Sequence, residues 1–232
     1  MPPVGFFAAQ PSTFASSSGQ LTLLVPSATR PLDVLLALVV VPNASSLAAP
    51  AGWTELASLA GSVTYTLHVF RRVAAYDEPA QHVFQCSVGA SPDPVALLLL
   101  YRGLDASAAL IATARTEVSS SGTAFPAPSV TLVNYSDLVL LAYYGTKNPP
   151  GTFTPAAGTT QRGYVAGSAQ GSLMVADYLQ EAIGATPTES ATESGASTGF
   201  AATIAVQATP VQVAPSIVPD VPGAIGFVTV GV

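Results

Sequence analysis

Apolar and polar side chains alternate along short stretches of the chain, and turn-forming residues separate these stretches. Between residues 62 and 70, every second side chain is apolar, from Val63 to Val69. This period of two predicts a strand with one buried face and one wetter face. Residues 34–41 and 95–100 are apolar on both faces, which predicts strands near the centre of a sandwich.

Ten segments carry this strand signature, which is a short run rich in Val, Thr, Tyr and Phe bounded by Gly, Pro, Ser or Asn. They are residues 21–25, 33–41, 53–59, 62–73, 82–87, 95–101, 129–133, 137–144, 172–179 and 200–208. Helices are disfavoured because 20 prolines and 19 glycines are spread through the chain. Only residues 178–183 are suited to a helical turn. The pattern therefore predicts an all-β protein.

A weak internal repeat indicates how these strands are arranged. Four segments match four later ones in the same order, namely 33–37 with 137–142, 50–54 with 155–160, 62–69 with 172–179, and 95–101 with 200–206. Chance similarity between generic strand and turn segments is the alternative, but the order and the spacing of the matches agree. We therefore predict an antiparallel β-sandwich of two similar halves, whose sheets pack face to face around a shared core.

The two ends of the chain differ from this body, so three regions are expected: an extended segment 1–19, the sandwich 20–210 and a C-terminal arm 211–232. The arm is apolar and rich in proline, which favours extended backbone. Because an exposed tail is normally polar, we expect the arm to pack on its own sandwich or on another chain. The candidate partner-binding residues of the arm are Ile217, Val218, Val221, Ile225, Phe227 and Val228.

Charge and composition exclude several classes of function. Only 9% of the residues are charged, the net charge is −6, and Lys147 is the single lysine. Nucleic acid is therefore not expected as a partner, because phosphate contacts need clustered Lys and Arg. Membrane insertion is not expected either, since the longest strongly apolar runs fall far short of the ~20 residues of a spanning helix. The first 29 residues lack the basic residues of a secretory signal.

Catalytic and metal-binding chemistry finds little support in the sequence. Residues 195–199 match the G-x-S-x-G pattern around Ser197, but a Ser/Thr/Gly-rich loop precedes them and a strand follows, whereas a nucleophile elbow turns from strand into helix. His68 and His82 lie well before the serine and are expected to be surface or cross-strand residues. The single cysteine, Cys86, is expected to be a buried hydrophobe. No catalytic, cofactor-binding or metal-binding residue is predicted.

Several structural segments, taken together, resemble a known family. They are LDVLLA at 32–37, PAGWT at 50–54, YTLHVFRRVA at 65–74, EP at 78–79, VF at 83–84, YRGLD at 101–105 and TFTPAAGTTQR at 152–162. Over about residues 20–208, the chain resembles a jelly-roll-like β-sandwich domain of bacteriophage virion proteins and of some bacterial extracellular proteins. It departs from the family pattern at Pro31 and Leu32, where glycine usually precedes the aspartate, and in its apolar arm.

The resemblance implies a non-enzymatic structural role on the surface of a virus particle, without a cofactor. We expect a capsid decoration protein, because the sequence shows no heptads or fibre repeat. Its expected partners are other virion proteins, such as the major capsid or tail protein, and further copies of itself in a homo-oligomer. A tail or fibre appendage, or a carbohydrate-binding module that attaches to a cell-surface glycan, is the alternative. A glycosidase is a more distant alternative function.

Overall fold

The computed structural model describes residues 4–15, 18–43, 45–61, 64–87, 94–104, 110–133, 137–168 and 171–207. Every regular element in these residues is a β-strand, and all strand pairs in the sheets are antiparallel. The predicted all-β sandwich is confirmed. The expected helical turn at 178–183 is wrong, because its first residues end a strand. The narrower prediction of a jelly-roll connectivity stays a prediction.

Two large sheets form the middle of the molecule, one from each half of the chain. The N-terminal inner sheet has the order β1 (Gly5–Pro11), β9 (Val95–Arg102), β4 (Val34–Pro42), β7 (Tyr65–Val73) and β6 (Thr54–Leu59). The C-terminal inner sheet has the order β10 (Leu110–Ala127), β17 (Glu189–Val206), β12 (Asp137–Gly145), β15 (Ser172–Gln180) and β14 (Thr160–Ala166). The matched segments of the sequence occupy the same places in the two sheets, so the predicted repeat is confirmed.

Irregular features are repeated as well. A register shift interrupts the β6–β7 ladder after Glu55, and a corresponding shift interrupts the β14–β15 ladder after Gln161. The turns that precede β6 and β14 contain Gly52 and Gly158, whose φ angles are +85° and +84°. A left-handed backbone conformation at matching positions favours glycine in both halves. Equivalent bulges and turns make chance similarity an insufficient explanation of the repeat.

The two inner sheets pack face to face, and alternate residues of their strands form the predicted shared core. In β4, Val34, Leu36 and Leu38 point into this core, whereas Leu35 and Ala37 belong to a second apolar cluster on the other side of the sheet. Both faces of β4 are therefore buried, which explains why the whole strand is apolar.

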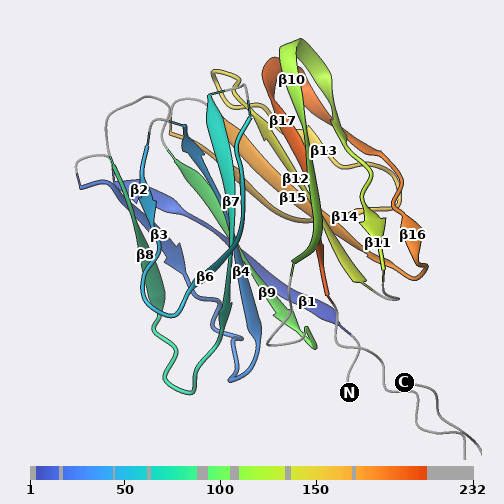
Figure 1. Cartoon of the computed structure of the whole chain (residues 1–232). Coiled ribbons are helices and arrows are strands. Elements are labelled where there is room, and N and C mark those ends of the chain that lie inside the picture. The colour runs from blue at the N-terminus through green and yellow to red at the C-terminus, as the bar shows by residue number, and fades with distance from the viewer. Residues whose placement is uncertain are drawn as a thin grey trace, which may run out of the picture.

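Each inner sheet also carries an outer layer, so the described residues form four β layers (Figure 1). The buried apolar side chains of these residues form three cores. The N-terminal outer sheet has the order β2 (Thr13–Ala15), β3 (Gln20–Leu24), β8 (Gln81–Cys86) and β5 (Leu47–Ala48). The C-terminal outer layer consists of β11 (Thr131–Leu132), β13 (Phe153–Thr154), β16 (Gly184–Ala185) and the outer parts of β10 and β17. The expectation of one sandwich was therefore incomplete, because each half is a two-layered sandwich of its own.

Some strands lie where the sequence did not predict them. The N-terminal segment contributes β1 and β2 to the sheets, and β10 pairs with β17 in a long antiparallel ladder. The stretch around Ser197, which was expected to be a loop, lies within β17. The expectation for Cys86 holds, since it is a buried strand residue, and burial raises the pKa of its thiol to about 11. The arm residues Ile217, Val218, Val221, Ile225, Phe227 and Val228 lie outside the described residues.

Candidate functional site

The exposed large apolar side chains of the described residues gather at one end of the molecule, which we call the apolar end. Four come from the N-terminal half and three from the C-terminal half. They are Phe7, Leu24, Leu32, Tyr76, Val133, Leu179 and Ile183. Tyr76 is the most exposed at 92%, and Leu32 follows at 70%. Large apolar side chains grouped on a surface mark a site of interaction with another molecule.

In the N-terminal half, strand ends and turns bring these residues together. Leu24 ends β3 and pairs with Gln81, the first residue of β8. The Leu32 amide donates a hydrogen bond of 2.9 Å to the carbonyl of Ala74, directly after β7. Tyr76 lies in the turn between β7 and β8. The three apolar side chains therefore belong to neighbouring connections at one edge of the sandwich.

The C-terminal half repeats this arrangement. Leu132 of β11 pairs with Gly184 of β16, which places Val133 and Ile183 at the same end of this two-stranded ladder. Leu179 is the residue before the last of β15. All three lie where the strands of the C-terminal half meet their connecting turns.

The apolar side chains of the two halves lie at the same end of the molecule, because residues of both halves line a cavity of about 290 Å³ there. Tyr101 near the end of β9 faces it from the N-terminal half, and Leu138 and Leu179 face it from the C-terminal half. Strand β1 also begins at this end and β17 finishes there (Figure 1). Both halves therefore contribute to the apolar end, and a cavity lies between them.

Polar groups join the two halves at the floor of this cavity. The Tyr101 hydroxyl donates to Asp177 Oδ2 at 2.6 Å, and Arg162 Nε donates to Asp177 Oδ1 at 2.6 Å. The Arg162 guanidinium also lies 4.7 Å from the centre of the Phe6 ring. Burial first, and then the Asp177 carboxylate, raise the pKa of Tyr101 well above 10, so the hydroxyl remains a donor. These contacts connect β9 directly to β15.

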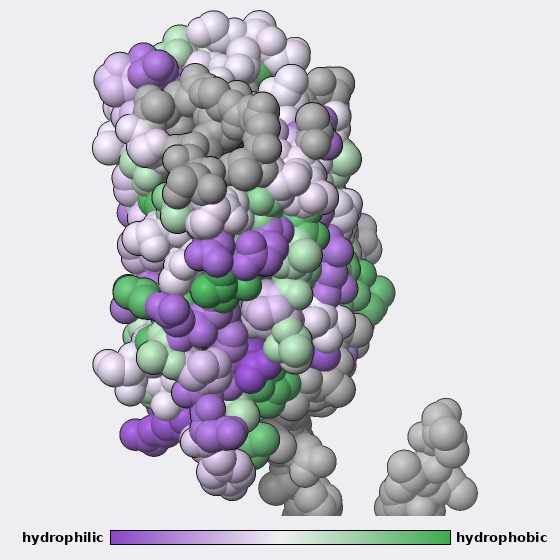
Figure 2. Space-filling view, turned by 90° about the vertical axis from the view of Figure 1, so that its left-hand side faces the viewer, coloured by the Kyte–Doolittle hydropathy of each residue, from purple (hydrophilic) through white to green (hydrophobic). Residues whose placement is uncertain are grey.

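One charged pair near the apolar end is neutralised within the protein. Arg102 donates two hydrogen bonds of 2.7 Å to the two carboxylate oxygens of Asp33. Its guanidinium lies 3.8 Å from the centre of the Phe7 ring. By contrast, the outer face of the N-terminal half is mostly pale and purple, with green only in small separate areas (Figure 2). The apolar character is therefore concentrated at the end and not on this outer face.

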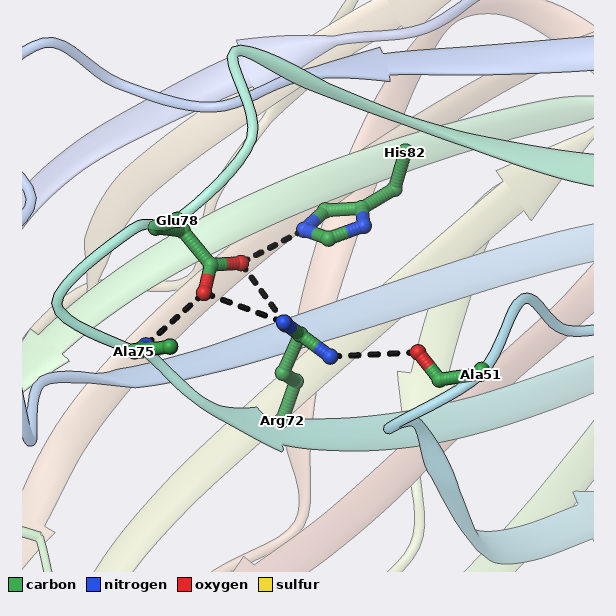
Figure 3. Close-up of polar contacts among 5 residues, drawn as sticks. All are labelled: Ala51, Arg72, Ala75, Glu78 and His82. Carbon is green, nitrogen blue, oxygen red and sulfur yellow. Dashed lines mark hydrogen bonds and ion pairs between the residues drawn. The ribbon is translucent and has the colours of Figure 1, made fainter.

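The turn that carries Tyr76 is held by a buried polar network (Figure 3). Glu78 Oε1 accepts from Arg72 Nε and from His82 Nε2, both at 2.7 Å. Glu78 Oε2 accepts from the Ala75 amide at 2.8 Å. The side chains of Glu78 and His82 are only 7% and 5% exposed. This network fixes the backbone on both sides of Tyr76 and so presents its ring to solvent.

The same network corrects an expectation about His82, which is buried and does not lie on the surface. Burial lowers the pKa of His82 by more than the bond to Glu78 raises it, so the neutral imidazole donates to the carboxylate. Burial alone would raise the pKa of Glu78, but its bonds to Arg72, Ala75 and His82 together lower it. His68, in agreement with expectation, is a cross-strand residue whose Nδ1 lies 2.7 Å from Glu55.

Another buried carboxyl group, that of Glu193, lies at the opposite end, where β12 finishes. Glu193 is 1% exposed, and the Ser197 hydroxyl donates to its Oε2. Among the described residues, no donor reaches its Oε1. Gly145 and Gly151 leave room for this oxygen, because a Cβ at either position would lie 2.5 Å from it. Burial is the largest influence on Glu193 and raises its pKa. Ser197 thus stabilises a buried carboxyl group.

Replacing Glu193 with glutamine is expected to stabilise the protein at alkaline pH by about 1 kcal/mol. A carboxyl whose folded pKa is raised is stable when protonated, and this stability is lost as the pH rises through the folded pKa. Glutamine has the same shape and does not ionise. Urea unfolding of both proteins between pH 4 and pH 9 checks this, and a difference that does not grow with pH would contradict it.

Within the described ranges, no group of three or more His, Cys, Asp or Glu side chains is placed to hold a metal ion. The part of the chain described by the structure also contains no helix that is long and apolar enough to span a membrane.

The sequence did not reveal the residues of the apolar end, because they are single apolar residues in or beside turns, spread from Phe7 to Ile183. Their only signal is a large apolar side chain at a position where a polar one is usual.

Comparison of the chain with family models, with curated proteins and with solved structures found no match.

Proposed function

We propose that this protein is a non-enzymatic structural component of a bacteriophage particle, and that it binds other virion proteins through its apolar end. The observation that supports this proposal most strongly is that all seven exposed large apolar side chains of the described residues lie at this one end. Capsid decoration is the specific role that we favour. The bacteriophage assignment rests on the family resemblance of the sequence, and the binding surface rests on the structure.

The energetics of the apolar end support a docking role. Full burial of a large apolar side chain contributes about 1.5–3 kcal/mol, and these seven side chains are between 43% and 92% exposed. Covering them all would therefore contribute on the order of 5–10 kcal/mol, before the cost of association. The β layers and their three apolar cores hold the turns that carry these side chains. Binding therefore has to restrict few backbone conformations in these turns.

We expect the protein in purified particles, in a regular array on the capsid, and we expect the double variant Leu32→Ser, Tyr76→Ser to be lost from them. Both side chains are exposed, so the variant should fold normally. Mass spectrometry of the particles and electron cryo-microscopy measure its presence and position. Thr123→Ser, Ala124→Ser is the matched control, because both residues are exposed on β10 at the opposite end.

Two outcomes would contradict the proposal. Absence of the native protein from purified particles would remove the virion role. Normal incorporation of the Leu32→Ser, Tyr76→Ser variant would show that the apolar end is not the docking surface. A position on the tail or fibre instead of the capsid would favour the alternative appendage, and loss of attachment to cells after removal of surface glycans would favour the carbohydrate-binding module.

A further inference from the structure

Leu32 has an unusual backbone conformation for its residue type. Among the described residues, it is the one residue other than glycine with a positive φ angle, which is +70°. The Asp33 amide donates a hydrogen bond of 3.1 Å to the Arg30 carbonyl, so residues 30–33 form a β-turn. Because the ring of Pro31 requires a negative φ, the positive φ of the next residue makes this a type II turn. Glycine is the usual residue at that position, and a leucine there is strained.

The turn is held on both sides, so this strain cannot relax. The Leu32 amide donates to the Ala74 carbonyl at 2.9 Å, and the Ala74 amide donates to the Asp33 carbonyl at 2.8 Å. The Arg30 amide donates to Asp33 Oδ2 at 2.8 Å, and Arg102 binds both carboxylate oxygens of Asp33. A rigid turn therefore presents the exposed Leu32 side chain to solvent.

Neither the backbone nor the side chain of Leu32 stabilises the described fold. The left-handed conformation is unfavourable for a residue with a Cβ atom, and an exposed leucine side chain buries little apolar surface. Strained residues that a rigid surrounding maintains concentrate at sites where a protein binds another molecule. The contact that compensates for the strain of Leu32 is therefore expected outside the described fold.

We propose that Leu32 is the specificity-determining residue of the apolar end, and that it enters an apolar pocket of the virion protein on which this chain docks. This inference deepens the proposed function and rests on it. A leucine on a rigid, exposed turn suits a concave apolar pocket, because the turn loses little conformational entropy when it binds.

The charge beside Leu32 favours a different protein over a second copy of this chain. Arg30 begins the same turn, is exposed and takes part in none of the ion pairs between described residues. A two-fold contact centred on Leu32 would bring the Arg30 guanidinium groups of both copies together, and like charges repel. A pocket with an acidic group at its rim would instead pair with Arg30.

Substitutions of Leu32 separate binding from stability. Leu32→Ala keeps the Cβ atom and with it the backbone strain, but removes most of the apolar side chain, whereas Leu32→Gly removes both. The number of copies per purified particle, measured by mass spectrometry, should fall at least about tenfold for both variants, and Leu32→Met should retain native incorporation. In thermal unfolding of the purified protein, Leu32→Ala should melt like the native chain and Leu32→Gly about 2–4 °C higher.

Two controls accompany this series. Leu24 is also exposed at the apolar end, but it ends a regular strand, so Leu24→Ala should lower incorporation less than about threefold. Arg30→Glu should lower incorporation at least about tenfold, whereas Arg30→Lys keeps the charge and should retain it. Equal losses for Leu24→Ala and Leu32→Ala, or normal incorporation of Arg30→Glu, would contradict the proposed pocket.

Other results would overturn the inference as well. They are normal incorporation of Leu32→Ala, and a Leu32→Gly variant that melts no higher than Leu32→Ala. A lower melting temperature of Leu32→Ala than of the native chain would show that Leu32 packs within its own chain. A native dimer that Leu32→Ala dissociates in sedimentation would show that a second copy covers it.

Failure of this inference is distinguishable from failure of the proposed function. If Leu32→Ala enters particles normally while the Leu32→Ser, Tyr76→Ser variant does not, only this inference fails. If the native protein is absent from purified particles, the proposed function itself fails.

Discussion

Replacing Glu78 with alanine is expected to lower the free energy of unfolding by about 3–5 kcal/mol. The carboxylate accepts hydrogen bonds from Arg72, His82 and the Ala75 amide, and it is only 7% exposed. Without it, the Arg72 guanidinium remains largely buried with no counter-charge at this position. Leaving one member of a buried ion pair uncompensated is among the most costly single changes. Urea unfolding measures the effect.

A matched control is available in the same half of the protein. Glu55 lies 2.7 Å from His68, but its side chain is 44% exposed. An ion pair that contacts water contributes little, so Glu55→Ala should cost less than about 1 kcal/mol. Equal losses for the Glu55 and Glu78 variants would show that burial does not determine the contribution of the network.

The network also sets the direction of the pH dependence of the N-terminal half. Burial lowers the pKa of His82 below its ordinary value of 6.5, and the bonds to Glu78 lower the pKa of that carboxyl below 4.5. Groups with lowered pKa values stabilise the fold above their ordinary values, and this contribution is lost as the pH falls. The native protein should therefore lose stability on acidification below about 6.5. Glu78→Ala should remove the share of this loss that the carboxyl contributes below about 4.5, and should enlarge the share of His82, because Glu78 raises the pKa of His82.

The strands that the sequence predicted well are those with large apolar side chains on one or both faces. In β4 and β9, adjacent leucines and valines serve two different cores, so the apolar run is continuous and easily recognised. Strand β10 was missed because its exposed outer part, around Ser120, carries mainly small and polar side chains. Its pairing with β17 over almost the whole length holds this part of the strand, and such pairing is not visible in a local pattern.

The apolar end could not be predicted, for a related reason. A turn residue such as Tyr76 or Ile183 has no periodic neighbours, so the pattern of the surrounding sequence says nothing of its environment. Only the assembled strands bring the turns of both halves to one end, and only the shared core aligns the halves with each other. The repeat predicted the shared core, but the sequence did not indicate which connections would carry exposed apolar residues.

Replacing Gly199 with alanine is expected to cost about 3 kcal/mol or more, or to prevent folding. Gly199 lies where β17 passes from the outer layer to the inner sheet, opposite Gly145 of β12. Its φ angle is +157°, and a Cβ there would overlap the carbonyl oxygen of Tyr144 and lie 3.0 Å from the Phe125 ring. Tyr144 is itself in β12 between two paired strands, so its backbone cannot yield without breaking a ladder.

Gly122→Ala is the control for this change, because Gly122 lies on the adjacent strand and pairs with Ser197. A Cβ at Gly122 would approach the nearest atom to only 3.7 Å, which is ordinary van der Waals contact. Alanine there should change stability by less than about 1 kcal/mol, since it adds no clash and restricts the unfolded chain. Urea unfolding and the yield of soluble protein compare the two variants. Similar stability for both would mean that the passage of β17 between layers tolerates a side chain, and that the close approach of β12 and β17 at Gly199 is not required by the fold.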